Sequence, residues 1–386
     1  MSMKLCLGVD AANIRLGGGR TYLIELLAHL DSNTTAFTKI IVWGAQETLD
    51  CLPDHPLVSK VHCPNLEGSL LTRTLWQIFK LPALARKANC NMLFVPGGVF
   101  MCSFRPIVTV SLNLLPFSPK EIAKYGLSWQ TVKFWLLRWL QGRSFKNSSG
   151  LIFLADYPRS VVNAKVSPLP LSQAVIPLGV SKAFERDARE QHAISEYSES
   201  NPYKIVYVSS LHPYKNHKTL ISAVAKVRES TRWPIRLDLV GPGSQEQVAE
   251  LKLFAQSFKD VKTWLHWSGN LPYEQLSDLY AHADLGVFSS SCENMPNILT
   301  EMMASGLPIV SSSTRPMPDI LKDGGIYYDP MSESETAAAI TKAISDPKLR
   351  KTMAQIGKEL SSQYTWSDAS LKTIQFLEQL AYRVSR

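Results

Sequence analysis

Two glutamates, Glu293 and Glu301, stand eight residues apart just after an apolar run, and their spacing indicates a ligand-binding pair. Eight residues correspond to a little over two turns of a helix. If a helix starts just after Glu293, Glu301 therefore points back toward the same ligand along one helix face. A carboxylate can accept hydrogen bonds from two vicinal hydroxyls, such as those of a ribose. The pair predicts a site for a polyhydroxylated ligand.

A lysine, Lys215, stands at a second junction, between the apolar run 205–209 and a helical pattern over residues 218–229. A lysine at such a place combines a point charge with the positive end of a helix dipole, and both favour a diphosphate. The alternative is a solvated lysine in a loop.

Three consecutive glycines, Gly17 to Gly19, precede Arg20 and a helical pattern over residues 21–30. Glycines let the backbone approach a ligand closely, and the amides at a helix start suit an anion. Tyr22 occupies the next spaced position of a dinucleotide-binding GxGxxG motif, so a dinucleotide oxidoreductase is disfavoured. The alternative is a tight turn between strand and helix.

All three junctions lie where a short apolar run meets a helical pattern. The runs cover residues 4–9, 40–43, 92–95, 107–110 and 151–153 in the first half and 205–209, 237–240, 284–289 and 309–312 in the second. Such runs, divided by helices, predict an α/β fold with two Rossmann-like doubly wound parallel sheets that face each other across a cleft. Ligands of such sheets bind at the carboxyl ends of the strands.

The polarity of the chain divides it into four segments. We predict an N-terminal domain over residues 1–180, a polar linker over 181–203 and a C-terminal domain over 204–365. A final helix, 366–386, can cross back to the N-terminal domain.

The composition is that of a globular protein, with 386 residues, 45% hydrophobic and 19% charged. No stretch reaches the ~20 apolar residues of a spanning helix, and the start lacks the pattern of a secretory signal. Six cysteines include no CxxC pair, so free thiols in a reducing cytosol are expected. We therefore expect a cytoplasmic protein without a metal finger.

The basic surplus lies in the first half, where residues 1–180 hold 18 lysines and arginines against 9 acidic residues, whereas residues 181–386 hold 23 against 24. This asymmetry predicts an anionic partner: a phosphate, a nucleic acid or an anionic membrane surface. The alternative is a solvated basic surface. No nucleic-acid-binding motif accompanies the charge, so we expect no nucleic-acid partner.

Residues 120–146 concentrate this charge, with six basic residues against one acid, Glu121. An apolar helical stripe runs through the same segment and consists of Val132, Trp135, Leu136, Trp139 and Leu140. A basic, tryptophan-rich helix can lie on an anionic membrane, which would place the protein peripherally on the inner face of the cell membrane. Alternatively, the stripe packs into the first domain.

The junctions together resemble the family 4 retaining glycosyltransferases of the GT-B fold, in particular a bacterial subgroup with Glu-Asn-x-Pro-Asn at the start of the Glu-x7-Glu motif. The similarity covers nearly the whole chain and includes residues 177–180, 237–241, 267–276 and 280–284.

The resemblance implies an acceptor-binding N-terminal domain and a nucleotide-sugar-binding C-terminal domain. The implied reaction moves a sugar from a UDP-, GDP- or dTDP-sugar to a glycan or lipid-linked glycan. The setting would be bacterial lipopolysaccharide, O-antigen or exopolysaccharide synthesis. The nucleotide sugar is a substrate, and no cofactor is implied.

By the same resemblance, Lys215 holds the donor diphosphate and stabilises the departing nucleoside diphosphate, Glu293 contacts the donor sugar, and Glu301 binds the ribose. The other donor-binding residues implied are Gly18, Gly19, Ser210, Asn270, Leu271, Asn294, Met295, Pro296 and Asn297. Arg20 and Asn113 are candidates on the acceptor side. The chain contains no Asp-x-Asp, so we expect a metal-independent enzyme with no metal ligands.

The chain departs from the family pattern at two positions that matter for function. Ser210 replaces an arginine that often precedes the lysine, so the leaving group lacks one cation, which Arg20 or Arg315 could replace. Ser111 replaces a first-domain histidine, and Asn113 lies close by.

Two other function classes stay open. The first is a sugar-nucleotide epimerase of GT-B fold, which would need more acid and base residues in the cleft than Ser111 leaves. The second is a scaffold that has kept the fold and lost activity, which Ser210 allows. The retention of Lys215, Glu293 and Glu301 argues against a scaffold.

Overall fold

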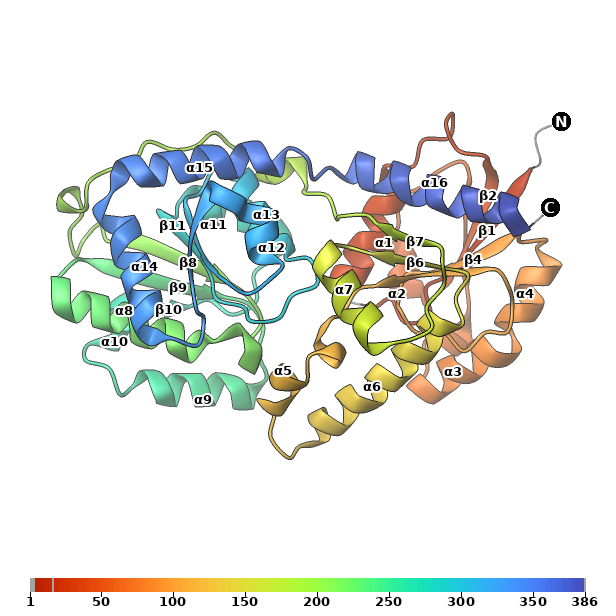
Figure 1. Cartoon of the computed structure of the whole chain (residues 1–386), viewed down its shortest axis with the longest axis horizontal. Helices are drawn as coiled ribbons and strands as arrows, with labels where there is room; N and C mark the ends of the chain where they lie inside the picture. Colours follow the sequence, from red (N-terminus) through yellow and green to blue (C-terminus); the bar gives the residue numbers. More distant parts are fainter. Residues whose placement is uncertain (1–3, 16, 385–386) are drawn as a thin grey trace. The chain divides into compact units, whose positions relative to one another are not determined.

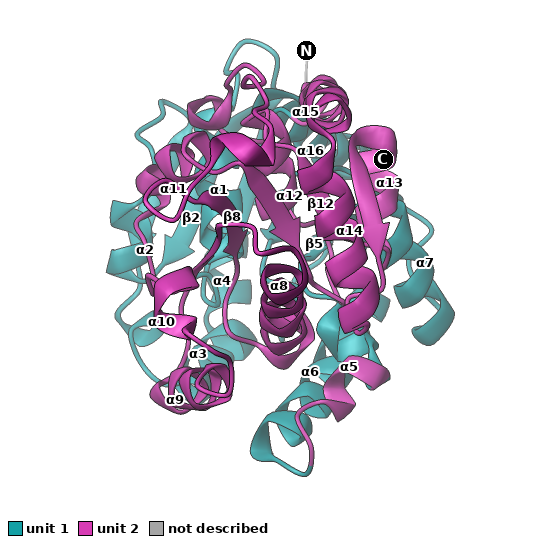
Figure 2. Cartoon of the chain, turned by 90° about the vertical axis from the view of Figure 1, so that its left-hand side faces the viewer, with its two compact units in different colours: residues 1–119, 127–179, 365–386 teal, residues 120–126, 180–364 magenta. Residues whose placement is uncertain are grey.

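The computed structural model describes residues 4–15 and 17–384 and divides into two compact units (Figure 1). Unit 1 consists of residues 1–119, 127–179 and 365–386, and unit 2 consists of residues 120–126 and 180–364 (Figure 2). Each unit is built on one parallel sheet with its own helices. The predicted fold class of two Rossmann-like parallel sheets is confirmed.

Unit 1 contains a seven-stranded sheet in the order β3-β2-β1-β4-β5-β6-β7. Its strands are β1 (Leu5–Asp10), β2 (Phe37–Gly44), β3 (Val58–His62), β4 (Met92–Val95), β5 (Ile107–Ser111), β6 (Gly150–Phe153) and β7 (Gln173–Val175). Its helices are α1 (Gly18–Ala28), α2 (Gln46–Asp50), α3 (Leu70–Phe79), α4 (Leu81–Lys87), α6 (Trp129–Lys146), α7 (Asp156–Lys165) and α16 (Trp366–Val384). Strands β4, β5 and β6 are buried along their whole length because helices cover both faces of the sheet.

Unit 2 contains a six-stranded sheet in the order β10-β9-β8-β11-β12-β13. Its strands are β8 (Tyr203–Val208), β9 (Ile235–Val240), β10 (Leu265–Trp267), β11 (Leu285–Phe288), β12 (Ile309–Ser312) and β13 (Gly325–Tyr328). Its helices are α8 (His217–Thr231), α9 (Gln245–Ala255), α10 (Val261–Trp264), α11 (Tyr273–Ala281), α12 (Asn297–Ala304), α13 (Met317–Leu321), α14 (Glu333–Ser345) and α15 (Pro347–Ser361). The short helix α5 (Pro119–Ala123) begins at the boundary and lies mostly in this unit.

The strand order of unit 2 reverses between β8 and β11, which pair in parallel with Ile205 opposite Leu285. From β8 the chain moves outward to β9, and from β11 it moves the other way to β12. The loops that leave β8 and β11 therefore diverge, and such a switch point opens a crevice at the carboxyl ends of the strands.

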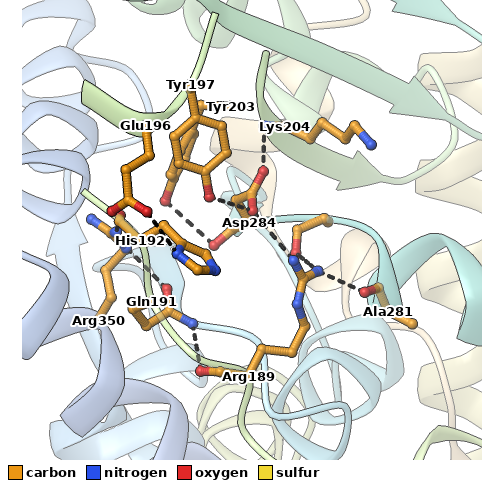
Figure 3. A network of polar contacts seen from close by, with 11 residues as sticks. Arg189, Gln191, His192, Glu196, Tyr197, Tyr203, Lys204, Ala281, Asp284 and Arg350 are labelled. Carbon is orange, nitrogen blue, oxygen red and sulfur yellow. Dashed lines mark hydrogen bonds and ion pairs between the residues drawn. The ribbon is translucent and has the colours of Figure 1, made fainter. Parts of the chain in front are cut away.

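The segment predicted to be a linker, residues 181–203, is part of unit 2 and is bonded to its other elements (Figure 3). The Asp284 carboxylate accepts hydrogen bonds from the Tyr197 hydroxyl and the Lys204 amide, each at 2.8 Å. Fully buried Arg350 donates to the backbone oxygens of Ala343 and Ile344. It also donates to the side-chain oxygen of Gln191, which lies in this segment, at 3.0 Å. These bonds fix the segment that leads into β8.

The C-terminal helix α16 packs on α1 within unit 1. The Trp366 ring lies 6.4 Å from the ring of Tyr22, and the Ser370 hydroxyl donates to the Leu26 oxygen at 2.8 Å. A side chain at Gly179 would approach the Trp366 nitrogen to 2.1 Å, so this position requires glycine.

Candidate functional site

Lys215 and Glu293 form an ion pair at the switch point of unit 2. Lys215 ends a short 3-10 turn, Pro213–Lys215, after β8, and Glu293 lies in the loop after β11. Their side chains are only 12% and 15% exposed. The structure thus brings together two residues that are 78 positions apart in the chain, and it places a cation and a carboxylate at the carboxyl ends of adjacent strands.

Hydrogen bonds between the two loops hold this pair in place. Asn216 takes a left-handed backbone conformation with φ of 54°, which asparagine tolerates better than most residues. Its side-chain amide donates to the Ser289 oxygen at 2.7 Å, and the Ser291 amide donates to the Tyr214 oxygen at 2.9 Å. The buried hydroxyl of Tyr207 donates to the Lys215 oxygen at 2.9 Å.

His217 follows this loop but adds no positive charge to it. Burial and the nearby Lys215 lower the pKa of His217 to about 3, so the ring is neutral. Its Nε2 lies 3.0 Å from the Ser209 hydroxyl. We assign it to the packing of the loop.

Helix α12 begins at Asn297, so the expectation that a helix starts directly after Glu293 is wrong. The cause is Pro296, because a proline disfavours the helical conformation in the residue before it, here Met295. Residues 293–296 therefore form a loop, and Glu301 lies on the second turn of α12. Buried Asn294, Met295 and Pro296 connect the two glutamates.

Glu301, on the buried side of α12, is only 3% exposed. The Tyr273 hydroxyl donates to its Oε1 at 2.9 Å. Within the described part of the chain, Oε2 is buried without a hydrogen-bond partner. Burial raises the pKa of Glu301 to about 7, and the bond from Tyr273 opposes this rise.

Two further buried polar atoms lie on these elements, the Tyr280 hydroxyl and the side-chain oxygen of Asn297, and neither has a partner among the described residues. Buried polar atoms are nearly always hydrogen-bonded in proteins. Unused acceptors at α12 therefore suit a ligand with several hydroxyls. Tyr273 and Tyr280 were not predicted from the sequence, although they lie in the segments 267–276 and 280–284 that carry the family resemblance.

Asn270 and Leu271, two of the predicted donor-binding residues, lie in the loop that follows β10. Gly269, with φ of 67°, accepts a hydrogen bond from the Gly241 amide at 2.7 Å. A side chain at Gly241 would come within 2.1 Å of the Ser209 oxygen, which explains the glycine of the 237–241 motif. Asn270 is exposed and Leu271 is half-buried, so both can contact a ligand.

Each of the two arginines predicted to replace the missing cation pairs with a carboxylate, as Lys215 also does, so their role at the leaving group stays a prediction. Arg20 pairs with Glu47 at 3.2 Å within unit 1, and Arg315 pairs with Asp319 at 2.8 Å within unit 2. Ser210 is half-buried and cannot supply a charge.

A different basic residue, Lys124, lies against the two loops of the site. Its Nζ lies 3.0 Å from the Ser291 hydroxyl, 3.3 Å from the Asn216 side-chain oxygen and 2.8 Å from the Glu121 carboxylate. Residues 120–126, which the sequence analysis grouped with the basic helix, thus belong to the surroundings of this site.

The predicted residues of the first half lie in unit 1. Gly18, Gly19 and Arg20 form the first turn of α1, which begins three residues before the predicted 21–30. The Arg20 amide donates to the Gly17 oxygen at 3.0 Å, and the amides that precede it in the first turn lack an acceptor within the helix and can bind an anion. Asn113 follows β5, and its side-chain oxygen accepts from the Leu115 amide at 3.0 Å.

Metal ligands are not gathered at these elements. Across residues 4–15 and 17–384, no group of three or more His, Cys, Asp or Glu side chains is arranged to hold a metal ion. The six cysteines are free thiols.

Residues 188–360 match the family model described as glycosyl transferases group 1. These residues make up most of unit 2, including both loops of the site. Among curated relatives, the O-antigen chain mannosyltransferase B of Escherichia coli is 26% identical over 227 residues, which cover 58% of this chain and 56% of that protein. The chain thus spans about half the length of that relative.

Two solved structures match over the whole chain. Sucrose-phosphate synthase from Thermosynechococcus elongatus has a TM-score of 0.74 at 16% identity and covers 98% of this chain and 99% of its own. Anabaena HepE in complex with UDP-glucose has a TM-score of 0.70 at 18% identity and covers 99% of both chains. These two matches show the fold alone, the GT-B arrangement of two parallel-sheet units, and the Glu-Asn-x-Pro-Asn subgroup stays a prediction.

Proposed function

We propose that this protein is a retaining, metal-independent glycosyltransferase. It moves a sugar from a nucleotide sugar to a glycan or lipid-linked glycan of a bacterial surface polysaccharide, at the inner face of the cell membrane. The observation that carries the proposal is the buried carboxylate of Glu301 with one oxygen unused, on the helix that follows the loop of the Lys215–Glu293 pair. A carboxylate buried without a partner costs free energy unless a ligand hydroxyl meets it.

The donor end of the site follows from these groups. Glu301 and the neighbouring buried acceptors bind the ribose hydroxyls, while the amides at the start of α12 and the Lys215 ammonium face the diphosphate. Glu293 accepts from a hydroxyl of the donor sugar once a phosphate replaces it as the partner of Lys215. A fixed ammonium stabilises the negative charge of the departing nucleoside diphosphate.

The chemical step retains the configuration at the anomeric carbon. The acceptor oxygen forms a bond to that carbon on the face from which the phosphate oxygen leaves. The proton of the acceptor hydroxyl passes to the departing phosphate. No protein nucleophile is required.

The donor to test first is UDP-glucose, because a protein of the same fold, HepE, is described in complex with it. GDP- and dTDP-sugars complete the panel, with a lipid extract of bacterial membranes as the acceptor source. We expect nucleoside diphosphate release that depends on the acceptor.

Lys215→Ala should lower this release by about 100-fold, the usual effect of losing one preorganised group that stabilises a developing anion. The matched control is Lys218→Ala, because Lys218 is exposed and pairs with Glu250 on the surface. Equal rates for the two variants would overturn the role of Lys215. Epimerised nucleotide sugar without acceptor use would identify an epimerase, and failure to bind any donor would identify a scaffold.

A further inference from the structure

Helix α6 of unit 1 turns its apolar stripe outward. Val132, Trp135, Leu136 and Trp139 are 53%, 46%, 55% and 62% exposed. The helix is held instead by buried residues near its C-terminal end, among them Phe145. The alternative that this stripe packs into the domain is therefore wrong. Contiguous exposed apolar surface of this kind marks an interaction site.

A second apolar cluster lies on α3. Leu70, Leu71 and Phe79 are 64%, 69% and 71% exposed. Right-handed crossovers from β3 to β4 and from β5 to β6 place α3 and α6 on the same face of the seven-stranded sheet. Figure 1 shows both helices on the side of the sheet opposite α16. Their outer surfaces therefore point the same way.

The charged residues of helices α3, α4 and α6 all have the same sign. The sequences of α3, α4 and α6 contain no aspartate or glutamate. Exposed or half-buried basic residues lie on the same helices, two on α4 and four on α6: Arg86, Lys87, Lys133, Arg138, Arg143 and Lys146. The Arg138 guanidinium lies over the ring of Trp135, at 5.3 Å from its centre.

A cavity of about 490 Å³ along α6 is lined by Trp135, Trp139, Arg138, Arg143 and Lys146, among others. It combines aromatic rings with cationic groups. That chemistry fits an anionic lipid headgroup.

We propose that the outer surface of α3, α4 and α6, the docking face, binds an anionic lipid bilayer. Tryptophan rings and basic side chains together favour the interface between headgroups and acyl chains. No helix in the described ranges is long and apolar enough to cross a membrane. The inference deepens the proposed function, since it names the surface on which a lipid-linked acceptor would be met. It keeps α6 of the predicted surface 120–146 and adds α3 and α4, whereas residues 120–126 are grouped with unit 2.

The test is co-sedimentation of the full-length chain with vesicles of phosphatidylcholine alone or with one third phosphatidylglycerol, without donor or acceptor. We expect binding to the anionic vesicles only, with a blue shift of tryptophan fluorescence. Lys133→Glu with Arg138→Glu should weaken binding at least about tenfold. Trp135→Ala with Trp139→Ala should abolish most of the fluorescence shift. Leu71→Ser with Phe79→Ser should weaken co-sedimentation with the anionic vesicles, because both residues are exposed on α3.

Two control variants match these changes outside the docking face. Lys348→Glu with Lys351→Glu reverses two exposed charges of unit 2, and Leu253→Ser removes an exposed leucine of α9. Both should bind like the parent, and circular dichroism establishes that every variant is folded.

Absence of binding by the parent chain, or equal losses in test and control variants, would overturn the proposal. A dimer in sedimentation velocity that becomes a monomer in Trp135→Ala with Trp139→Ala would also overturn the proposal, because a second copy of the chain would then cover the docking face. Because no sugar transfer is measured, failure here leaves the proposed activity standing, and loss of that activity leaves vesicle binding intact.

Discussion

Replacing Tyr273 with phenylalanine should raise the pKa of Glu301 further and shift the pH range in which a nucleotide sugar binds. Burial raises the pKa of this carboxyl to about 7, and the hydrogen bond from Tyr273 holds it below the value that burial alone would give. A hydrogen bond to a charged group contributes roughly 1.5–3 kcal/mol, and about 1.4 kcal/mol corresponds to one pH unit. Because Tyr273 is 40% exposed, water can partly replace its hydroxyl. We therefore expect an upward shift of about one pH unit.

The direction of the pH effect on affinity depends on which ionisation state of Glu301 binds the nucleotide sugar. Holding both ribose hydroxyls as donors needs the ionised carboxylate, because protonation turns one of its acceptor oxygens into a donor. Affinity should be constant above the pKa of Glu301 and fall by about tenfold for each pH unit below it. The parent should therefore begin to lose affinity near pH 7, and the Tyr273→Phe variant about one pH unit higher.

Isothermal titration calorimetry with UDP-glucose over this pH range measures the shift, because both phosphates of the ligand are esterified and keep a constant charge. Glu301→Gln should bind weakly at every pH, and Tyr327→Phe, which removes a hydroxyl elsewhere in unit 2, should behave like the parent. If Tyr273→Phe lowers the affinity by one factor at all pH values, or leaves it unchanged, the coupling to Glu301 is refuted.

Three further predictions concern the effect of Glu301 on stability, the effect of Lys124 on donor binding and the effect of metal removal on turnover. Since the pKa of Glu301 is raised from 4.5 to about 7 on folding, the native state binds more protons in this window and loses stability as the pH rises through it. In the parent, the free energy of unfolding should fall by about 3 kcal/mol between the lower and the upper end of this pH window, and Glu301→Gln should abolish that fall. Urea unfolding at the two pH values measures the difference. The same pH dependence in both proteins would contradict a buried, titrating carboxyl at position 301. Lys124→Ala should weaken donor binding several-fold, because the Ser291 hydroxyl loses its hydrogen bond from Lys124. Lys120→Ala, which removes an exposed lysine, should leave donor binding unchanged. Equal effects of the two substitutions would show that Lys124 does not belong to the site. Dialysis against EDTA should leave turnover intact, and complete loss with rescue by manganese would disprove a metal-independent reaction.

The position of Lys124 shows how the basic charge of the first half divides. Its ammonium is held by Glu121 and Ser291 beside the loop of Glu293. The basic residues of α6, in contrast, have no acidic neighbour on their own helix. One run of charge in the sequence therefore serves two surfaces of different chemistry.

The sequence by itself determined the two parallel sheets and the junctions that carry chemistry. Short apolar runs separated by helices are typical of parallel strands whose sheet is covered on both faces. The residue types of Lys215, Glu293 and Glu301 also fix which ligand groups they can meet.

Only the tertiary structure decided which of these groups meet one another and where they face. Lys215 and Glu293 are joined because β8 and β11 lie side by side, a pairing that spans 78 residues and leaves no local signal. Tyr273 reaches Glu301 in the same way, from α11 to α12. Helical periodicity places Trp135 and Trp139 on one side of α6, but only the packing of the other side determines that they face outward, because a period defines a face and not what covers it.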